Sequence, residues 1–166
     1  MNFAQKVATP YALLSTSDKR GISTLASFLE SKGLKILSTG GTAKILRNAK
    51  RISDLTSYPE ILGGRVKTLH PTIYGGILHL RGVQQHQEEL QKHHIPEIDI
   101  VVVNLYPFWR AVNEDLDMLK AQELIDIGGV SLIRAAAKNW QNVLVLTDPN
   151  DYQELMDDYD NLIKDH

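Results

Sequence analysis

The stretch Ile98-Asp99-Ile100-Val101-Val102-Val103-Asn104 decides the fold that we predict for this chain. Its β-branched residues form a short apolar run, and the run ends at a polar side chain. Such a run is typical of a parallel strand whose two faces are both covered by helices. The sequence therefore predicts a central strand with Asn104 and the following Tyr106 at its carboxyl end.

Segments on the amino-terminal side of this strand alternate between strand and helix patterns. Residues 11–15 and 34–37 are short apolar runs, which we predict as strands. Between them, apolar residues recur at helical spacing before a glycine that suits a helix end: Ile22, Leu25, Ala26, Leu29 and then Gly33. Strand, helix and strand in this space predict a right-handed βαβ unit.

The remaining segments continue the alternation. We predict helices at residues 43–48, 86–94, 116–125 and 130–139, a strand at 142–147, a helix or irregular connector at 72–78, and a loop with one helical turn at 50–59. The chain shows no internal repeat, linker or change of composition. We therefore expect a single domain over residues 1–166, a three-layer α/β fold with a mostly parallel central sheet and helices on both faces.

The composition limits the classes of function. Hydrophobic residues make up 43% and charged residues 23%, as in soluble globular proteins, and the net charge of −2 gives no general attraction to nucleic acid. The chain has no cysteine, so thiolate metal sites and cysteine nucleophiles are excluded. Residues 1–10 lack the apolar run of a signal peptide, and no stretch is as long as a membrane span. We expect a cytoplasmic protein that binds neither nucleic acid nor membranes, without a metal at the adjacent pair His93 and His94.

The loop at residues 63–71 (GGRVKTLHP) combines two glycines with Arg65, Lys67 and Thr68. Glycines allow backbone N–H groups to approach an anion, and the two cations supply charge. A solvated basic loop explains the same residues equally well. Arg134 and Lys138, four residues apart, are likewise compatible with a solvated basic helix face.

A second candidate anion site is the turn Ser38-Thr39-Gly40-Gly41-Thr42, which lies between a predicted strand and a predicted helix. Such a turn is either a phosphate cradle or a tight connection with Thr42 as the helix N-cap. Polar groups also follow the other predicted strands, at residues 15–19, at 104–106 and at 147–148. Because the carboxyl ends of parallel strands share one edge of a sheet, this convergence favours a phosphate site that includes Arg65 and Lys67.

Six motifs in series resemble a known family. They are LSTSDKRG at residues 14–21, STGGTA at 38–43, GGRVKTLHP at 63–71, NLYPF at 104–108, IDIGGV at 125–130 and RAAAKN at 134–139. The series resembles the IMP cyclohydrolase domain of the bifunctional AICAR transformylase/IMP cyclohydrolase, and the resemblance covers residues 12–152. It implies a methylglyoxal-synthase-like α/β fold.

The resemblance implies ring closure of 5-formamidoimidazole-4-carboxamide ribonucleotide (FAICAR) to IMP with loss of water, the last step of de novo purine synthesis. This is the activity of a hydrolase that acts on a cyclic amidine, and it requires no metal or organic cofactor. Two departures stand out. The segment between Asn48 and Ser53 is shorter than in the family, so we expect a short edge strand to be lost, and no transformylase domain or formyl transfer is expected.

Carried over residue by residue, the resemblance divides the site into three groups. The 5′-phosphate and ribose would be held by Ser15, Ser17, Lys19, Ser38, Gly40, Gly41, Thr42 and Thr68. The base would be surrounded by Arg65, Asn104, Asp126, Ile127, Gly128 and Gly129. For catalysis, our hypothesis is that Asp126 accepts the amide proton while Lys67, Tyr106 and Lys138 stabilise the oxyanion and protonate the leaving hydroxyl, with Lys138 orienting Asp126 across the Gly-Gly turn.

Two other functions compete with this hypothesis. A phosphate- or nucleotide-binding module of the same fold, like the allosteric domain of carbamoyl-phosphate synthetase, would use the same turns without turnover. Methylglyoxal synthase fits less well, because Ser17 and Asp18 stand where that family is expected to have a His-Asp pair. For partners, the resemblance leaves open a homodimer and a separate AICAR transformylase.

Overall fold

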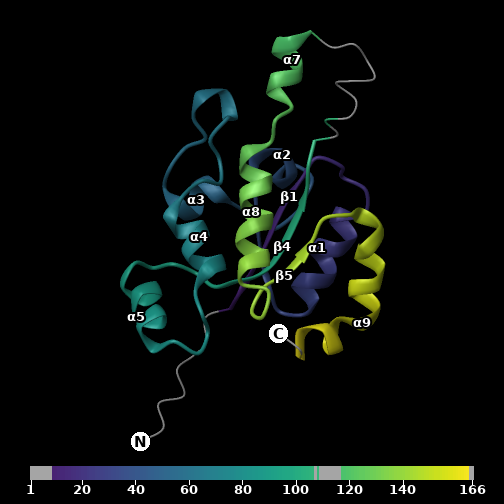
Figure 1. Ribbon diagram of the computed structural model, residues 1–166. Coiled ribbons are helices and arrows are strands. Elements are labelled where there is room, and N and C mark those ends of the chain that lie inside the picture. The colour runs from purple at the N-terminus through teal and green to yellow at the C-terminus, as the bar shows by residue number, and fades with distance from the viewer. Residues whose placement is uncertain (1–8, 107, 109–116, 165–166) are drawn as a thin grey trace, which may run out of the picture.

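A computed structural model describes residues 9–106, 108 and 117–164, and Figure 1 shows their arrangement. In this part of the chain, five parallel strands form one sheet in the order β3-β2-β1-β4-β5. The strands are β1 (Tyr11–Thr16), β2 (Lys35–Ser38), β3 (Lys50–Arg51), β4 (Ile98–Asn104) and β5 (Leu144–Leu146). The predicted parallel α/β sheet is confirmed, and β4 has the predicted bounds.

The topology creates a crevice between β1 and β4. From β1 the chain proceeds outward to β2 and β3, whereas β4 lies on the other side of β1 and is followed by β5. β1 and β4 are paired so that Thr16 lies opposite Asn104 at their carboxyl ends. Ligands of open parallel sheets bind beyond the strand ends at such a reversal of direction. The fold therefore predicts a site above Thr16 and Asn104.

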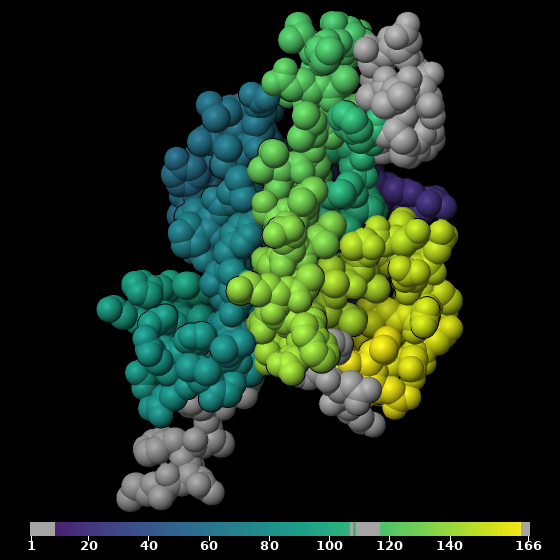
Figure 2. Space-filling model, in the orientation of Figure 1, coloured from purple at the N-terminus to yellow at the C-terminus, as the bar shows by residue number. Residues whose placement is uncertain are grey.

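Helices cover both faces of the sheet. One face carries α1 (Ile22–Ser31) and α9 (Tyr152–Lys164), whose apolar side chains pack with alternate residues of β1 and β4. The other face carries α4 (Pro71–Leu78) and α8 (Ile127–Lys138). Figure 2 shows α8 crossing the middle of one surface, between the blue and teal segments that include α4 and α5 (Gln84–Lys92) and the yellow helix α9. The shorter helices are α2 (Gly40–Ala43), α3 (Ile52–Thr56) and α7 (Met118–Glu123).

The first βαβ unit agrees with its prediction in detail. The residues that α1 buries are the predicted set, namely Ile22, Leu25, Ala26 and Leu29. Gly33 follows the helix with a φ of 91°, a conformation that glycine adopts without strain. In the part of the chain that the structure describes, no helix has both the length and the apolar character that crossing a membrane requires.

Three predictions about helices and strands are wrong. The helix after the Gly-rich turn is the single turn α2, which begins at Gly40 rather than at residue 43. The edge strand that we expected to be lost is present as β3, a two-residue strand paired with β2. Gly128 and Gly129 lie inside the first turn of α8 and do not form a turn before it. Of the helix predicted at 116–125, α7 is observed, and Leu116 lies outside the described residues.

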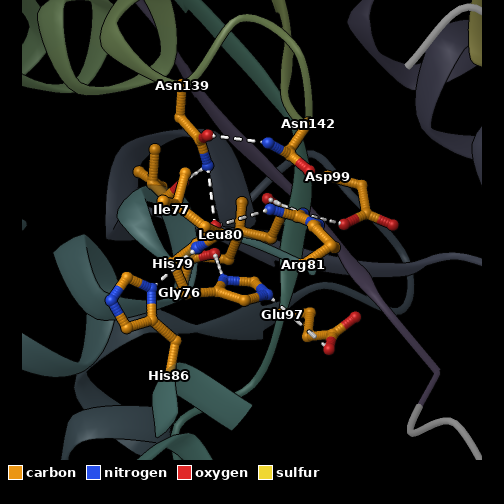
Figure 3. A network of polar contacts seen from close by, with 11 residues as sticks. Gly76, Ile77, His79, Leu80, Arg81, His86, Glu97, Asp99, Asn139 and Asn142 are labelled. Atoms are coloured by element: carbon orange, nitrogen blue, oxygen red, sulfur yellow. Dashed lines mark hydrogen bonds and ion pairs between the residues drawn. The ribbon is translucent and has the colours of Figure 1, made fainter. Parts of the chain in front are cut away.

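A polar network fastens the amino-terminal end of the sheet, opposite the crevice (Figure 3). The amide nitrogen of buried Asn139, just after α8, donates to the carbonyl oxygens of Ile77 and His79 at 2.7 and 2.9 Å. The His79 ring lies 3.6 Å from the Glu97 carboxylate, and this contact holds the pKa of Glu97 below its usual value. The network therefore ties the ends of α4 and α8 to the segment that enters β4.

Helix α4 packs closely against the segment that enters β4. Adding a single methyl group at Gly76 on α4 should therefore destabilise the fold. A Cβ added at Gly76 would lie 2.4 Å from the carbonyl oxygen of Pro96, which is backbone and cannot rotate away. We expect Gly76→Ala to lower the free energy of unfolding by about 1–3 kcal/mol despite the better helix propensity of alanine. Urea unfolding measures this change. The matched control is Gly82→Ala, whose Cβ would meet no heavy atom within 4 Å, and equal stability of the two variants would contradict the prediction.

Candidate functional site

A cavity of about 670 Å³ opens at the carboxyl ends of β1 and β4, where the topology predicts a ligand site. Its walls come from five segments far apart in the sequence. They are the end of β1 with the turn after it, the Gly-rich turn that becomes α2, the loop at residues 62–69, the end of β4 with Asn104 and Tyr106, and the segment from the end of α7 to the first turn of α8. In Figure 1 these segments meet at the upper end of the sheet.

Asn104 shapes the first wall. Its Oδ1 accepts hydrogen bonds from the backbone N–H groups of Ser17 and Asp18 at 2.6 and 2.7 Å, and its Nδ2 donates to the carbonyl oxygen of Asp18 at 3.0 Å. Three hydrogen bonds from one amide fix the turn that carries Ser17 and Lys19. Asn104 lines the cavity as predicted, but its side chain binds this turn, a role that the sequence did not indicate.

Lys19 brings a positive charge to the cavity floor. Its ammonium group donates to Thr42 Oγ1 at 2.7 Å and to the carbonyl oxygen of Thr16. Thr42 is 1% exposed, and its hydroxyl oxygen also accepts the backbone N–H of Thr16 at 3.2 Å. The pKa of Lys19 is lowered, first by burial and then by the positive charge of Lys67. An anion bound between the two ammonium groups would relieve both effects.

The loop at residues 62–69 is a tight hairpin closed by a bridge between Ile61 and Val66. Gly63 and Gly64 have φ values of 65° and 89°, which favour glycine at both positions. The Lys67 side chain folds over Gly64, with Nζ 3.3 Å from the place that a Cβ on Gly64 would take. The Arg65 guanidinium lies 3.4 Å from the carboxylate of Glu123 on α7. The hairpin therefore places both predicted cations at the cavity, with Arg65 at its outer rim.

The start of α8 forms the opposite wall. Asp126 is the N-cap residue, and its Oδ1 accepts the backbone N–H of Gly129 at 2.7 Å. Thr68 from the hairpin packs against this turn, with Oγ1 only 2.8 Å from the position of a Cβ on Gly128. Glycine at this position thus allows the loop and the helix to approach closely, and Asp126, Thr68 and Lys67 all line the same cavity.

Most of the predicted site residues meet in this cavity. Those that line it are Ser15, Ser17, Lys19, Gly41, Thr42, Arg65, Lys67, Thr68, Asn104, Tyr106, Asp126, Ile127, Gly128 and Gly129. Ser38 and Gly40 do not line it. Ser38 is fully buried and donates to the carbonyl oxygen of Leu14 at 2.8 Å, while the backbone N–H of Gly40 donates to the Glu60 carboxylate at 3.1 Å.

The expectation that Lys138 lies close enough to Asp126 to orient it is wrong. Lys138 is the last residue of α8 and Asp126 caps the first, so the helical rise of about 1.5 Å per residue separates them by roughly 18 Å. Lys138 is exposed and directly precedes Asn139, whose hydrogen bonds to Ile77 and His79 lie at the end of the sheet away from the cavity. Within one chain it therefore cannot orient Asp126, and the catalytic hypothesis retains Lys67, Tyr106 and Asp126.

Several lining residues had no predicted role. Thr16 and Thr39 lie within the quoted motifs, so their types and positions were a usable signal. The cavity also receives Gln122, Glu123 and Ile125 from α7 and the segment after it. Ile125 begins the quoted motif at 125–130, whereas no local pattern marks Gln122 and Glu123, which only the folded chain brings to the cavity.

Comparisons with known proteins agree with this fold. Residues 21–131 match the family described as "MGS-like domain". The chain is 53% identical over 157 residues to the "Bifunctional purine biosynthesis protein PurH" of Prochlorococcus marinus (strain NATL1A), covering 91% of this chain and 30% of that protein. It is 52% identical over 145 residues to the protein of the same name from Aquifex aeolicus (strain VF5), covering 85% and 29%.

A solved structure supports the same relationship. The protein described as "Crystal structure of ForH" superposes with a TM-score of 0.78 at 36% identity, covering 93% of this chain and 80% of that chain. This chain spans about 30% of the length of the curated relatives that it matches. Because the family match covers more than half of the chain, this chain belongs to the MGS-like domain family, and its curated relatives are bifunctional PurH proteins.

Proposed function

We propose that this chain is an IMP cyclohydrolase, which closes the second ring of FAICAR to give IMP and water. One observation carries the proposal: Lys67, Tyr106 and Asp126 line the same cavity. The floor of this cavity contains the cation Lys19 and the hydroxyl-bearing residues Ser15, Ser17 and Thr42. A site that only bound phosphate would need the floor but not the other three residues. The PurH relatives, which act in purine biosynthesis by name, support the same assignment.

The floor of the cavity suits the 5′-phosphate. Lys19 provides the positive charge of the floor, and its pKa is lowered first by burial and then by the nearby charge of Lys67. Ser15, Ser17 and Thr68, which carry hydroxyl groups, line the same cavity. A dianionic phosphate would bind here through charge-assisted hydrogen bonds, which are shorter and stronger than neutral ones. The ribose and base would then extend toward Tyr106 and the start of α8.

The reaction forms one C–N bond within a single molecule. The carboxamide nitrogen attacks the formyl carbon, and one proton from this nitrogen ends on the former formyl oxygen, which becomes a hydroxyl. That hydroxyl leaves as water with the proton of the formamide nitrogen, and a C=N bond forms. Because both reacting groups belong to one ligand, holding them face to face supplies much of the catalysis.

Three side chains would assist these steps. Asp126 would accept the amide proton through Oδ2, since Oδ1 accepts the N–H of Gly129. Lys67 and Tyr106 would stabilise the negative charge that develops on the formyl oxygen, and one of them would protonate the departing hydroxyl. The balanced reaction needs no metal or organic cofactor. A separate AICAR transformylase would supply the substrate, and a homodimer is the other proposed partner state.

Ultraviolet absorbance on ring closure tests the proposal directly. We expect the wild-type chain to convert FAICAR to IMP, and Lys67→Met to lower kcat/KM by about 10²–10³-fold because a charged donor to the oxyanion is lost. Lys44→Met is the matched control, since Lys44 is exposed and lies outside the cavity. Equal turnover by wild type and Lys67→Met would contradict the role of Lys67.

A binding module without turnover is the second candidate. It is favoured by one observation, namely that the Asp126 carboxylate already serves as the N-cap of α8. Calorimetry with IMP separates the two functions. Tight binding of IMP by a chain that leaves FAICAR unchanged would identify the binding module, whereas conversion of FAICAR identifies the enzyme.

A further inference from the structure

The carboxylate of Glu60 joins two walls of the cavity from outside it. Its Oε1 accepts a hydrogen bond from the backbone N–H of Gly40 at 3.1 Å, across 20 positions of the sequence. Gly40 is the first residue of α2, and Ile61, which follows Glu60, pairs with Val66 to close the hairpin. Among the described residues, this is the hydrogen bond that connects the hairpin to the Gly-rich turn.

The other carboxylate oxygen of Glu60 lies near the side chain of Lys67. A Cβ placed on Gly64 would lie 3.9 Å from Glu60 Oε2 and 3.3 Å from Lys67 Nζ, so both charged groups are within 4 Å of one point beside the hairpin backbone. Opposite charges this close attract each other, although the attraction is modest at an exposed site. The carboxylate therefore favours the position in which Lys67 folds over Gly64 and lines the cavity.

The hairpin benefits from this link because the two ammonium groups of the cavity repel each other. Burial, and then the positive charge of Lys67, lower the pKa of Lys19 on the cavity floor. Their repulsion opposes the approach of the hairpin to the floor. The contacts of Arg65 and Thr68 hold the hairpin to α7 and α8, on a different wall. The hydrogen bond from Gly40 to Glu60 acts on the side of the floor.

We propose that Glu60 is a positioning residue for the nucleotide site: its carboxylate fastens the hairpin to the Gly-rich turn and holds Lys67 at the cavity. The inference rests on the proposed function, because it takes the ligand to be a nucleotide whose reaction Lys67 assists. Glu60 lies outside the cavity lining, so it acts through the turn and through Lys67 and touches no ligand atom. Its hydrogen bond serves binding, and its negative charge serves turnover.

Two substitutions separate the hydrogen bond from the charge. Glu60→Ala removes both, and we expect it to raise the dissociation constant for IMP about 5–10-fold and to lower kcat for FAICAR about 3–5-fold. Glu60→Gln keeps an oxygen that can accept the Gly40 N–H, so IMP binding should stay within about twofold of wild type while kcat remains lowered. Glu60 is exposed, so neither substitution leaves a cavity in the core.

Two further variants test the link through its partners. A Cβ on Gly40 would lie 2.9 Å from Glu60 Oε1, so Gly40→Ala should displace the carboxylate and weaken IMP binding as Glu60→Ala does. In a Lys67→Met background, Glu60→Gln should cause no further loss of kcat, because the charge acts through Lys67. The control is Glu88→Ala, which should match the wild type: Glu88 is also exposed, and it accepts a hydrogen bond from Gln84 at 2.8 Å on α5.

Calorimetry with IMP and steady-state kinetics with FAICAR decide the result. Wild-type affinity in Glu60→Ala would overturn the inference, and so would tighter binding, which would identify the carboxylate as a competitor of the ligand. Equal losses of affinity in Glu60→Ala and Glu60→Gln, or additive losses of kcat with Lys67→Met, would also overturn it. In each case turnover by the wild type leaves the proposed function intact. A wild-type chain that binds neither IMP nor inorganic phosphate would overturn both.

Discussion

Asp126→Asn should lower kcat for ring closure by about 10²–10⁴-fold while leaving the stability of the chain unchanged. The side chain of Asp126 has two separable roles. As the N-cap of α8 it accepts the Gly129 N–H at 2.7 Å, and asparagine is an equally good N-cap. As the proposed base it must accept a proton, which an amide cannot do at neutral pH. The substitution therefore removes the chemistry and keeps the helix start.

Steady-state kinetics and urea unfolding, measured on the same protein, separate these roles. Asp126→Ala provides the contrast, because it removes both roles and should also cost about 1 kcal/mol of stability. The matched control is Asp148→Asn, since Asp148 caps the short helix at Pro149–Asp151 by accepting the N–H of Asn150 at 2.8 Å, outside the cavity. If Asp126→Asn retained the wild-type kcat, Asp126 could not be the base.

Asn104→Ala has the second large expected effect, and this one concerns binding. The variant loses the three hydrogen bonds that hold the turn carrying Ser17 and Lys19. At about 1 kcal/mol net for each bond, the free energy of unfolding should fall by about 3 kcal/mol. The affinity for IMP should fall about 10–100-fold, because the phosphate donors of the turn are no longer held in place.

The variant Asn104→Asp separates the effect of the two hydrogen bonds that Asn104 accepts from the effect of the one that it donates. An aspartate keeps both acceptor bonds to the N–H groups of Ser17 and Asp18, but it cannot donate to the Asp18 carbonyl oxygen and adds a negative charge near the phosphate. We expect a smaller loss of stability than in Asn104→Ala and a similar or larger loss of IMP affinity. Calorimetry and urea unfolding measure both, with Asn161→Ala on the exposed face of α9 as the control. Wild-type IMP affinity in Asn104→Ala would rule out a role for the turn in binding.

The sequence could predict β4 and α1 because their patterns are local. A strand covered on both faces must be largely apolar, and a helix covered on one face must repeat its apolar residues at helical spacing. Both conditions act within a few residues, so the bounds of Ile98–Asn104 and the buried residues of α1 follow directly.

The start of α8 could not be predicted in the same way. Glycine is a poor helix former, so Gly128 and Gly129 indicated a turn. In the folded chain they lie within the helix, and glycine is required there by close neighbours: Cβ atoms at these positions would lie 2.8 Å from Thr68 Oγ1 and from a methyl carbon of Leu105. Thr68 belongs to a segment 60 positions earlier in the chain, and no local rule reveals that contact. The misplaced helix start also led to the wrong position for Lys138.

The hydrogen bonds between the Asn104 side chain and the turn after β1 have a consequence for the order in which the chain folds during its synthesis. The hydrogen bond between Ser17 and Asn104 joins residues that are 87 positions apart. Contacts of such long range form late, because the intervening chain must first lose its conformational freedom. A growing polypeptide that has produced only the βαβ unit therefore carries the proposed phosphate-binding residues Ser15, Ser17 and Lys19 before the bond that fixes their turn can form. In the proposed function, nucleotide binding would therefore report that the two halves of the sheet have joined.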